Sequence, residues 1–172
     1  MRIIDRRRLL SLLAATALPA PASAETLPLI ELPGGVEAPD FALPDLTGTV
    51  HRLSDHRGRV VLVGFWAVWC APCRRELPVL ADLRARFGKA TIEMFAINLG
   101  DSADRVAAFL AEHPAPNLPV LLDRRRSAAA PWHVRGLPVA YVVDPGGVLR
   151  LGAIGERDWR AAVIEGQLRS LL

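Results

Sequence analysis

An almost uninterrupted apolar run, Val60–Trp66, limits the fold more than any other feature of the chain. Strands that are apolar at nearly every position are typical of the centre of a sheet, where both faces are buried. The sequence C-A-P-C follows at 70–73, and Pro72 fits the first turn of a helix, where its missing N–H costs nothing. A central strand is therefore expected, followed by a helix that begins at the cysteines and ends near Phe87, before Gly88.

The remaining segments alternate between short apolar strands and amphipathic helices. Further strands are expected at 41–43, 50–52, 91–98, 120–122, 139–143 and 148–154, and further helical segments at 102–112, 128–130 and 156–172. In the last helix Trp159, Val163 and Leu168 are expected to face inward. This order predicts an α/β fold, with a central mixed sheet, helices on both faces and a β-hairpin at the N-terminus.

The N-terminal residues are typical of an export signal. Four arginines within residues 1–8 precede a mostly apolar stretch, Leu9–Leu18, and the small residues of Ala22–Ala24 follow. This order predicts a signal peptide at 1–24, of either the Sec or the twin-arginine type, and therefore a periplasmic protein. An uncleaved signal would tether the protein to the membrane.

Without the signal, the chain has no strong net charge. Residues 1–24 contain four of the 21 basic and one of the 18 acidic residues, which leaves 17 of each. This balance argues against a nucleic-acid partner. Residues 25–35 show little periodicity and are expected to form a flexible tether before a single domain at 36–172. The cluster Arg124–Arg126 would suit an acidic partner, although a solvated loop explains it more simply.

Cys70 and Cys73 are the only cysteines, and their position predicts a redox-active dithiol. Thiolate is the reactive form of cysteine, and the positive end of a helix lowers the pKa of a thiol placed there. Cys70 is expected to be exposed and to attack a substrate disulfide, and Cys73 to be buried and to resolve the mixed disulfide. A structural disulfide is a weaker explanation, because so short a loop restricts little chain entropy. A zinc site completed by His51 and His56 would lack a second cysteine pair.

The residues around the cysteines resemble a known family. The sequences W-A-V-W-C-A-P-C-R-R-E at 66–76, A-P-D-F at 38–41 and G-L-P at 136–138 are similar to the exported TlpA/ResA/CcmG-type thioredoxin-like proteins. The resemblance implies a thioredoxin fold with an N-terminal hairpin and a central insertion. It also implies an extracytoplasmic thiol–disulfide oxidoreductase without a cofactor, commonly a reductase of selected proteins, as in cytochrome c maturation. The expected partners are protein disulfides or dithiols and a membrane or periplasmic electron donor, and a monomer is expected.

The resemblance also assigns roles to individual residues. Glu76 matches the family's acidic position and would carry protons to or from the resolving thiol, although the helix dipole alone also favours an acid there. Trp69 is expected to shape partner docking, with core packing as the alternative, and Pro72 to help tune the redox potential. Pro138 matches the family's cis-proline, and Leu137 would offer backbone groups to an extended substrate.

Other functions remain open from the sequence. A disulfide-forming oxidase can use the same fold, and the sequence does not fix the direction of electron flow. A copper-binding chaperone using Cys70, Cys73 and His133 is a further alternative, although such proteins usually place three residues between their cysteines. A peroxidase is disfavoured because no P-x-x-x-T-x-x-C element surrounds either cysteine. By the same resemblance, Gly64 stands where cytoplasmic thioredoxins carry a buried acid, which leaves more of any proton handling to Glu76 or to water.

Overall fold

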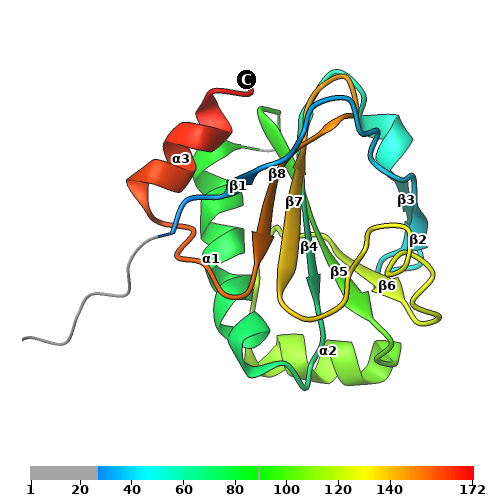
Figure 1. Ribbon diagram of the computed structural model, residues 1–172. Coiled ribbons are helices and arrows are strands. Elements are labelled where there is room, and N and C mark those ends of the chain that lie inside the picture. The colour runs from blue at the N-terminus through cyan, green and yellow to red at the C-terminus, as the bar shows by residue number, and fades with distance from the viewer. Residues whose placement is uncertain (1–26, 89) are drawn as a thin grey trace, which may run out of the picture.

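The computed structural model describes residues 27–88 and 90–172, which fold around a six-stranded mixed sheet (Figure 1). The predicted signal at 1–24 lies outside the described residues. The strands lie in the order β1-β8-β7-β4-β5-β6, with β4–β5 and β5–β6 parallel and the other neighbours antiparallel. Their bounds are β1 Ile30–Glu31, β4 Val60–Trp66, β5 Ile92–Leu99, β6 Val120–Asp123, β7 Val139–Val143 and β8 Leu149–Ile154.

A hairpin and several helices surround this sheet. The expected hairpin joins β2 (Ala42–Pro44) to β3 (Val50–Arg52), and the 3-10 helix η1 (Leu53–His56) follows it. The α-helices are α1 (Ala71–Phe87), α2 (Ala103–Glu112) and α3 (Ala162–Arg169). Helix α2 and strand β6 lie between β5 and β7 in the chain and form the expected central insertion.

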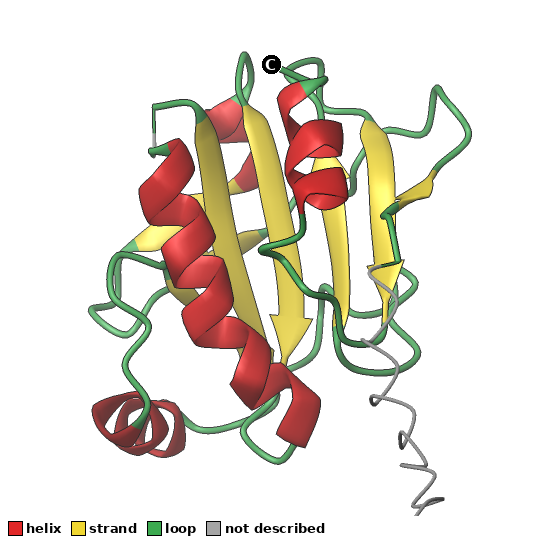
Figure 2. Ribbon diagram, turned by 90° about the vertical axis from the view of Figure 1, so that its left-hand side faces the viewer, coloured by secondary structure: helices red, strands yellow, loops and turns green. Residues whose placement is uncertain are grey.

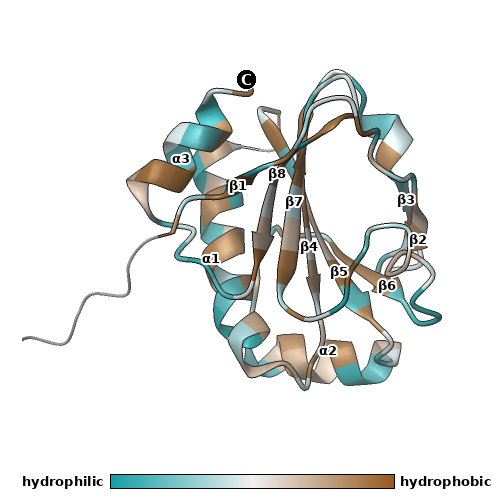
Figure 3. Cartoon of the chain, in the orientation of Figure 1, coloured by the Kyte–Doolittle hydropathy of each residue, from teal (hydrophilic) through white to brown (hydrophobic). Residues whose placement is uncertain are grey.

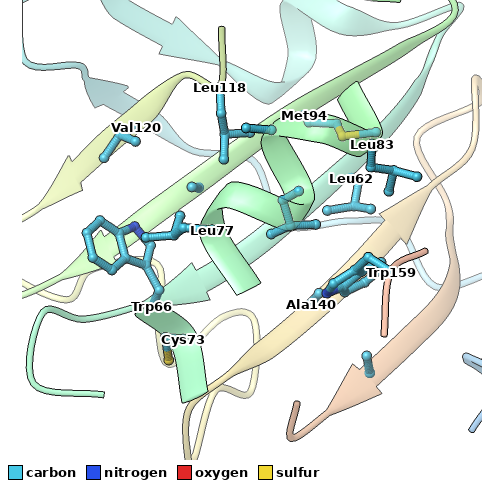
Figure 4. Packing of buried hydrophobic residues seen from close by; sticks show 14 of the residues in the cluster. Leu62, Trp66, Cys73, Leu77, Leu83, Met94, Leu118, Val120, Ala140 and Trp159 are labelled. Atoms are coloured by element: carbon cyan, nitrogen blue, oxygen red, sulfur yellow. The ribbon is translucent and has the colours of Figure 1, made fainter. Parts of the chain in front are cut away.

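The central strand β4 separates two hydrophobic clusters, because successive side chains of a strand point to opposite faces. Leu62 and Trp66 belong to the first cluster, together with buried residues of α1, α2 and α3. Figure 2 shows α1 and α3 over the same face of the sheet, and Figure 4 shows Leu83 of α1 close to Leu62 of β4 and Met94 of β5. In Figure 3 both α1 and α3 carry hydrophilic as well as hydrophobic residues, as amphipathic helices do.

Val63 and Phe65 belong to the second cluster, which the hairpin, η1 and the turns at 127–133 cover. The predicted mixed sheet with both faces covered is confirmed. The second face carries a 3-10 helix and turns in place of a long α-helix.

Part of the expected tether at 25–35 is ordered in the sheet. Strand β1 pairs with β8, and Leu29 is only 3% exposed. The backbone N–H of Leu29 donates to the Gln167 side chain at 2.8 Å, and Gln167 Nε2 donates to the Leu29 carbonyl at 3.0 Å. Where a flexible tether was predicted, Ile30 and Glu31 thus pair with Gly152 and Leu151, because β8 would otherwise present these backbone groups at the edge of the sheet.

The C-terminal helix is shorter than expected. It begins at Ala162 instead of residue 156, and Ile164 is buried in place of Val163, which is 44% exposed. Trp159 and Leu168 face inward as expected, but Trp159 precedes the helix. The helix starts late because the backbone and side chain of the preceding segment are hydrogen-bonded to α1, as described below.

Candidate active site

The two cysteines lie at the start of α1, just beyond the carboxyl end of β4. Cys70 is the N-cap residue, and its Sγ accepts a hydrogen bond from the backbone N–H of Cys73 at 3.3 Å. The two sulfurs form a disulfide, and Pro72 lies in the first turn of the helix, as expected. Because N–H groups and the helix dipole favour negative charge here, a Cys70 thiolate would be stabilised in the reduced protein.

The exposure of Cys70 differs from the expectation. Cys73 is 1% exposed, as expected for a resolving cysteine, but Cys70 is only 4% exposed in the disulfide form. Its sulfur is bonded to Cys73 and turned toward the first turn of the helix, which removes it from the surface. Trp69 is 61% exposed, so it forms surface beside the dithiol and does not fill the core, whereas Trp66 is buried.

The Leu137–Pro138 segment lies beside the chain that follows β4. The β4–β7 register pairs Phe65 with Val139, the residue directly after Pro138. The Leu137–Pro138 peptide bond is cis, as the resemblance implies. Within residues 27–88 and 90–172 no hydrogen bond uses the backbone N–H or carbonyl of Leu137. Leu137 therefore presents unpaired backbone groups near the dithiol.

Glu76 is a buried acid one helical turn after Cys73. It is 7% exposed, and its Oε1 accepts hydrogen bonds from the backbone N–H of Arg157 at 2.6 Å and from Trp159 Nε1 at 3.2 Å. No ion pair formed by the described part of the chain includes Glu76. Burial raises the pKa of Glu76 to about 7, although the two hydrogen bonds act in the opposite direction. The carboxyl group can therefore hold or release a proton near neutral pH.

A small cavity borders both Glu76 and the resolving cysteine. Its lining includes Cys73, Glu76, Gly64 and Trp159, and its volume is about 10 Å³. This is about the space that one water molecule needs. Gly64 also lines the cavity and leaves this side of it without a side chain. A Cβ at this position would lie in ordinary van der Waals contact with Leu80 Cδ1, at 3.6 Å. Figure 4 shows the Trp159 ring beside Ala140, another residue of the lining.

A second buried acid, Asp101, holds the loop that leads to Cys70. Its Oδ2 accepts hydrogen bonds from the backbone N–H of Val68 at 2.8 Å and from Asn98 Nδ2 at 3.0 Å. Its own backbone N–H donates to Asn98 Oδ1 at 3.1 Å. This anchor was not predicted, although a signal was present, because polar residues at the carboxyl ends of neighbouring parallel strands meet at one edge of the sheet.

The two donors to Glu76 were not predicted either. They lie 81 and 83 residues further along the chain, and no local pattern links them to α1. Trp159 was expected to be buried, which is confirmed, but its indole N–H also has a polar role.

No three His, Cys, Asp or Glu side chains in the described ranges are placed to hold a metal ion. His133 is exposed in the turns before β7. The structure therefore gives no support to the copper site of Cys70, Cys73 and His133, or to the zinc alternative. Among residues 27–88 and 90–172, no helix has the length and apolar character needed to cross a membrane.

The sheet topology, the disulfide at the start of α1 and the neighbouring cis-proline define a thioredoxin-like redox protein. The family model of the AhpC/TSA family matches residues 35–151, and the chain belongs to this family.

Named relatives agree with this class and with the expected resemblance. The thiol-disulfide oxidoreductase ResA of Geobacillus kaustophilus is 38% identical over 116 residues, which cover 67% of this chain and 66% of the relative. ResA of Bacillus subtilis is 35% identical over 113 residues, or 66% of this chain and 63% of the relative. The chain thus matches slightly less than two thirds of either protein.

A solved structure extends the similarity over most of the domain. It is a protein from Chlorobium tepidum described as a thiol:disulfide interchange protein, DsbE, with a TM-score of 0.74 and 34% identity. The match covers 81% of this chain and 98% of that protein. The predicted thioredoxin-like fold and the resemblance to the TlpA/ResA/CcmG-type proteins are confirmed.

Proposed function

We propose that the protein is an exported thiol–disulfide oxidoreductase that reduces disulfides in selected proteins. The observation that carries this proposal is the Cys70–Cys73 pair at the helix N-terminus, with Glu76 buried one turn further along. The similarity to ResA and to DsbE supports the same chemistry. The arginine-rich and apolar start of the chain supports export to the periplasm, with a membrane tether if the signal at 1–24 is retained.

In the reduced protein the Cys70 thiolate attacks one sulfur of the partner's disulfide. A Cys70–partner disulfide forms, and the other partner sulfur leaves as a thiolate. Cys73 then loses its proton and attacks the Cys70 sulfur, which releases the second partner sulfur. The partner gains two electrons and two protons, and the Cys70–Cys73 disulfide remains. A membrane or periplasmic dithiol donor returns two electrons and restores the cycle.

Glu76 acts as the proton acceptor for Cys73 in this scheme. Its side chain and Cys73 line the same cavity, which has room for one water molecule to pass the proton. Because burial raises the pKa of Glu76 to about 7, both protonation states are accessible at neutral pH, as a general acid–base group requires. Gly64 supplies no competing acid at this position.

The partner binds as an extended segment beside the cis-proline. The unpaired N–H and carbonyl of Leu137 would form main-chain hydrogen bonds with it, as in strand addition. Pro138 and Pro72 would border the partner's cysteine, and the exposed indole of Trp69 would contact its neighbours. Cysteine pairs of apocytochrome c are one substrate of this kind, and a monomeric protein is sufficient for the reaction.

The reduction potential of the Cys70/Cys73 couple tests the direction of electron flow. Equilibration against thiol–disulfide buffers should give about −230 mV or lower, which is the range of reducing thioredoxin-type proteins. A value near about −120 mV would mark a strong oxidant and assign the protein to disulfide formation instead. The absence of a reversible couple would refute thiol–disulfide exchange altogether.

Two serine variants test the order of attack. The Cys73→Ser variant should accumulate a stable mixed disulfide with a model protein disulfide through Cys70, because the resolving thiol is missing. The matched variant Cys70→Ser should accumulate none. Non-reducing electrophoresis and mass spectrometry identify the adduct, and equal trapping by both variants would contradict the assigned roles.

A further inference from the structure

A groove next to the dithiol contains two arginines. Its lining includes Trp69 and Leu137, together with Leu99, Val134, Arg126 and Arg135, and its volume is about 150 Å³. Trp69 directly precedes Cys70, and Leu137 directly precedes the cis-proline. This arginine groove therefore borders both segments that a partner's chain is expected to contact.

The two arginines of the groove lack a counter-charge. Both are exposed, and within the described residues neither guanidinium takes part in an ion pair or hydrogen bond. Some exposed arginines elsewhere are neutralised, because Arg75, Arg86 and Arg160 each pair with a carboxylate at 2.5–3.0 Å. Within the described residues Arg74, Arg124 and Arg125 are exposed and unpaired as well, but they do not line the groove. The groove thus combines an apolar wall with positive charge that the rest of the described fold does not neutralise.

Arg126 lies in a turn whose backbone is fixed by hydrogen bonds. The buried carboxylate of Asp123 accepts hydrogen bonds from the backbone N–H groups of Ser127 and Ala128, both at 2.8 Å. Arg126 has a positive φ of 55° within this turn, and its side chain lies against Gly100. A Cβ at Gly100 would stand 2.7 Å from Arg126 Nε, so only a glycine leaves room for this side-chain position.

We propose that the arginine groove selects partner segments that carry an acidic side chain close to the reactive cysteine. A guanidinium group binds a carboxylate through paired N–H donors, and the apolar wall accommodates the neighbouring aliphatic part of the segment. The same positive charge would also raise the encounter rate of acidic segments at low ionic strength. This inference rests on the proposed function and names the class of partner on which that function acts.

Two disulfide-linked peptides that differ only in Glu or Lys beside the cysteine test the proposal. The rate constant for reduction of each peptide by the reduced protein is divided by the rate with a neutral aromatic disulfide, so that general changes in thiol reactivity cancel. The Glu peptide should react roughly three- to tenfold faster at low salt, as expected for two exposed charge pairs. The preference should decrease at high salt because exposed charges are screened.

Variants then locate the preference. The double variant Arg126→Gln/Arg135→Gln should bring the two rates close together, and Arg135→Glu should shift the preference toward the Lys peptide. Arg125→Gln is the matched control, because Arg125 is the exposed neighbour of Arg126 but does not line the groove. It should keep the preference of the unmodified protein. Thermal unfolding of each variant checks that the fold is retained.

The outcomes separate this inference from the proposed function. Equal normalised rates for the two peptides, or the same loss of preference in Arg125→Gln, would overturn the inference and leave the proposed function intact. A preference that survives both high salt and the double variant would also overturn it, because the apolar wall would then carry the selection. A protein that does not reduce even the neutral disulfide would refute the proposed function itself.

Discussion

Two buried glutamates, Glu76 and Glu93, lie toward opposite ends of the sheet in opposite surroundings. Both are 7% exposed. Glu93, near the start of β5, accepts a hydrogen bond from Arg84 Nη2 at 2.8 Å and lies 3.6 Å from Arg59 Nη1. Glu76, in α1 near the carboxyl-terminal part of β4, receives hydrogen bonds within the described residues only from a backbone N–H and an indole N–H.

This difference separates a carboxylate suited to structure from one suited to proton transfer. A buried charge is costly unless an opposite charge is close by. Arg84 and Arg59 supply that charge to Glu93. Among the residues that the structure describes, no cation forms an ion pair with Glu76, and burial raises its pKa to about 7 although the charge of Arg157 acts in the opposite direction. The same residue type at the same exposure is thus suited to different roles because of its neighbours.

The largest expected effect comes from removing the cation at Glu93. The variant Arg84→Met should lower the free energy of unfolding by about 3 kcal/mol, because loss of one partner leaves a buried carboxylate poorly paired. Arg59 remains nearby and keeps the loss at this lower end of the usual range. Urea denaturation at pH 7 measures the change. The double variant Arg84→Met/Glu93→Gln should recover part of it, and a loss below about 1 kcal/mol would mean that Glu93 does not depend on Arg84.

The second effect concerns the pH dependence of stability at Glu76. Its pKa is about 7 in the fold and 4.5 ordinarily, so the fold favours the protonated carboxyl. The resulting stabilisation is complete below pH 4.5 and is lost as the pH rises through 7. Relative to Glu76→Gln, the disulfide form of the unmodified protein should therefore lose up to about 3 kcal/mol across this window.

Denaturant unfolding at a series of pH values checks this expectation. Glu76→Gln should be the more stable protein at pH 8 and should lack the transition. Glu112→Gln, at an exposed glutamate of α2, is the matched control and should retain it. Parallel pH profiles for Glu76→Gln and the unmodified protein would show that Glu76 keeps an ordinary pKa.

Of the two glutamates, the sequence predicted only the position of Glu76 in α1, and it did not predict the groups that surround this side chain. The apolar run of β4 and the spacing of Leu77, Leu80 and Phe87 in α1 depend on near neighbours, and both elements form at the expected positions. Glu76 could therefore be placed beside Cys73. Its indole donor lies 83 residues away, and the Asp101–Val68 hydrogen bond spans 33 residues. Such contacts depend on how the elements pack, and no local periodicity encodes them.

The third effect concerns Asp101. Like Glu93, this buried carboxylate accepts hydrogen bonds that stabilise the fold. Asp101→Ala would leave the Val68 N–H and the Asn98 amide without their acceptor, at a cost of about 2 kcal/mol. The freed loop should also change the rate at which Cys70 reacts with an alkylating reagent. Asp101→Asn keeps an acceptor oxygen and should have a smaller effect on both measurements. An unchanged alkylation rate in Asp101→Ala would show that the loop does not need this anchor.

The smallest expected effect is that of the exposed Glu156 charge on the pKa of Glu76. Burial is the main cause of the raised pKa of Glu76, and the negative charge of Glu156 adds to it. Glu156→Gln would remove that charge and release Arg75 from its ion pair, and both changes favour ionised Glu76. The pH transition should therefore move to lower pH, by less than the shift due to burial, because solvent screens a pair this exposed. A move to higher pH would show that the substitution weakens the Arg157 N–H bond to Glu76, so that backbone geometry, more than charge, sets the proton affinity of this site.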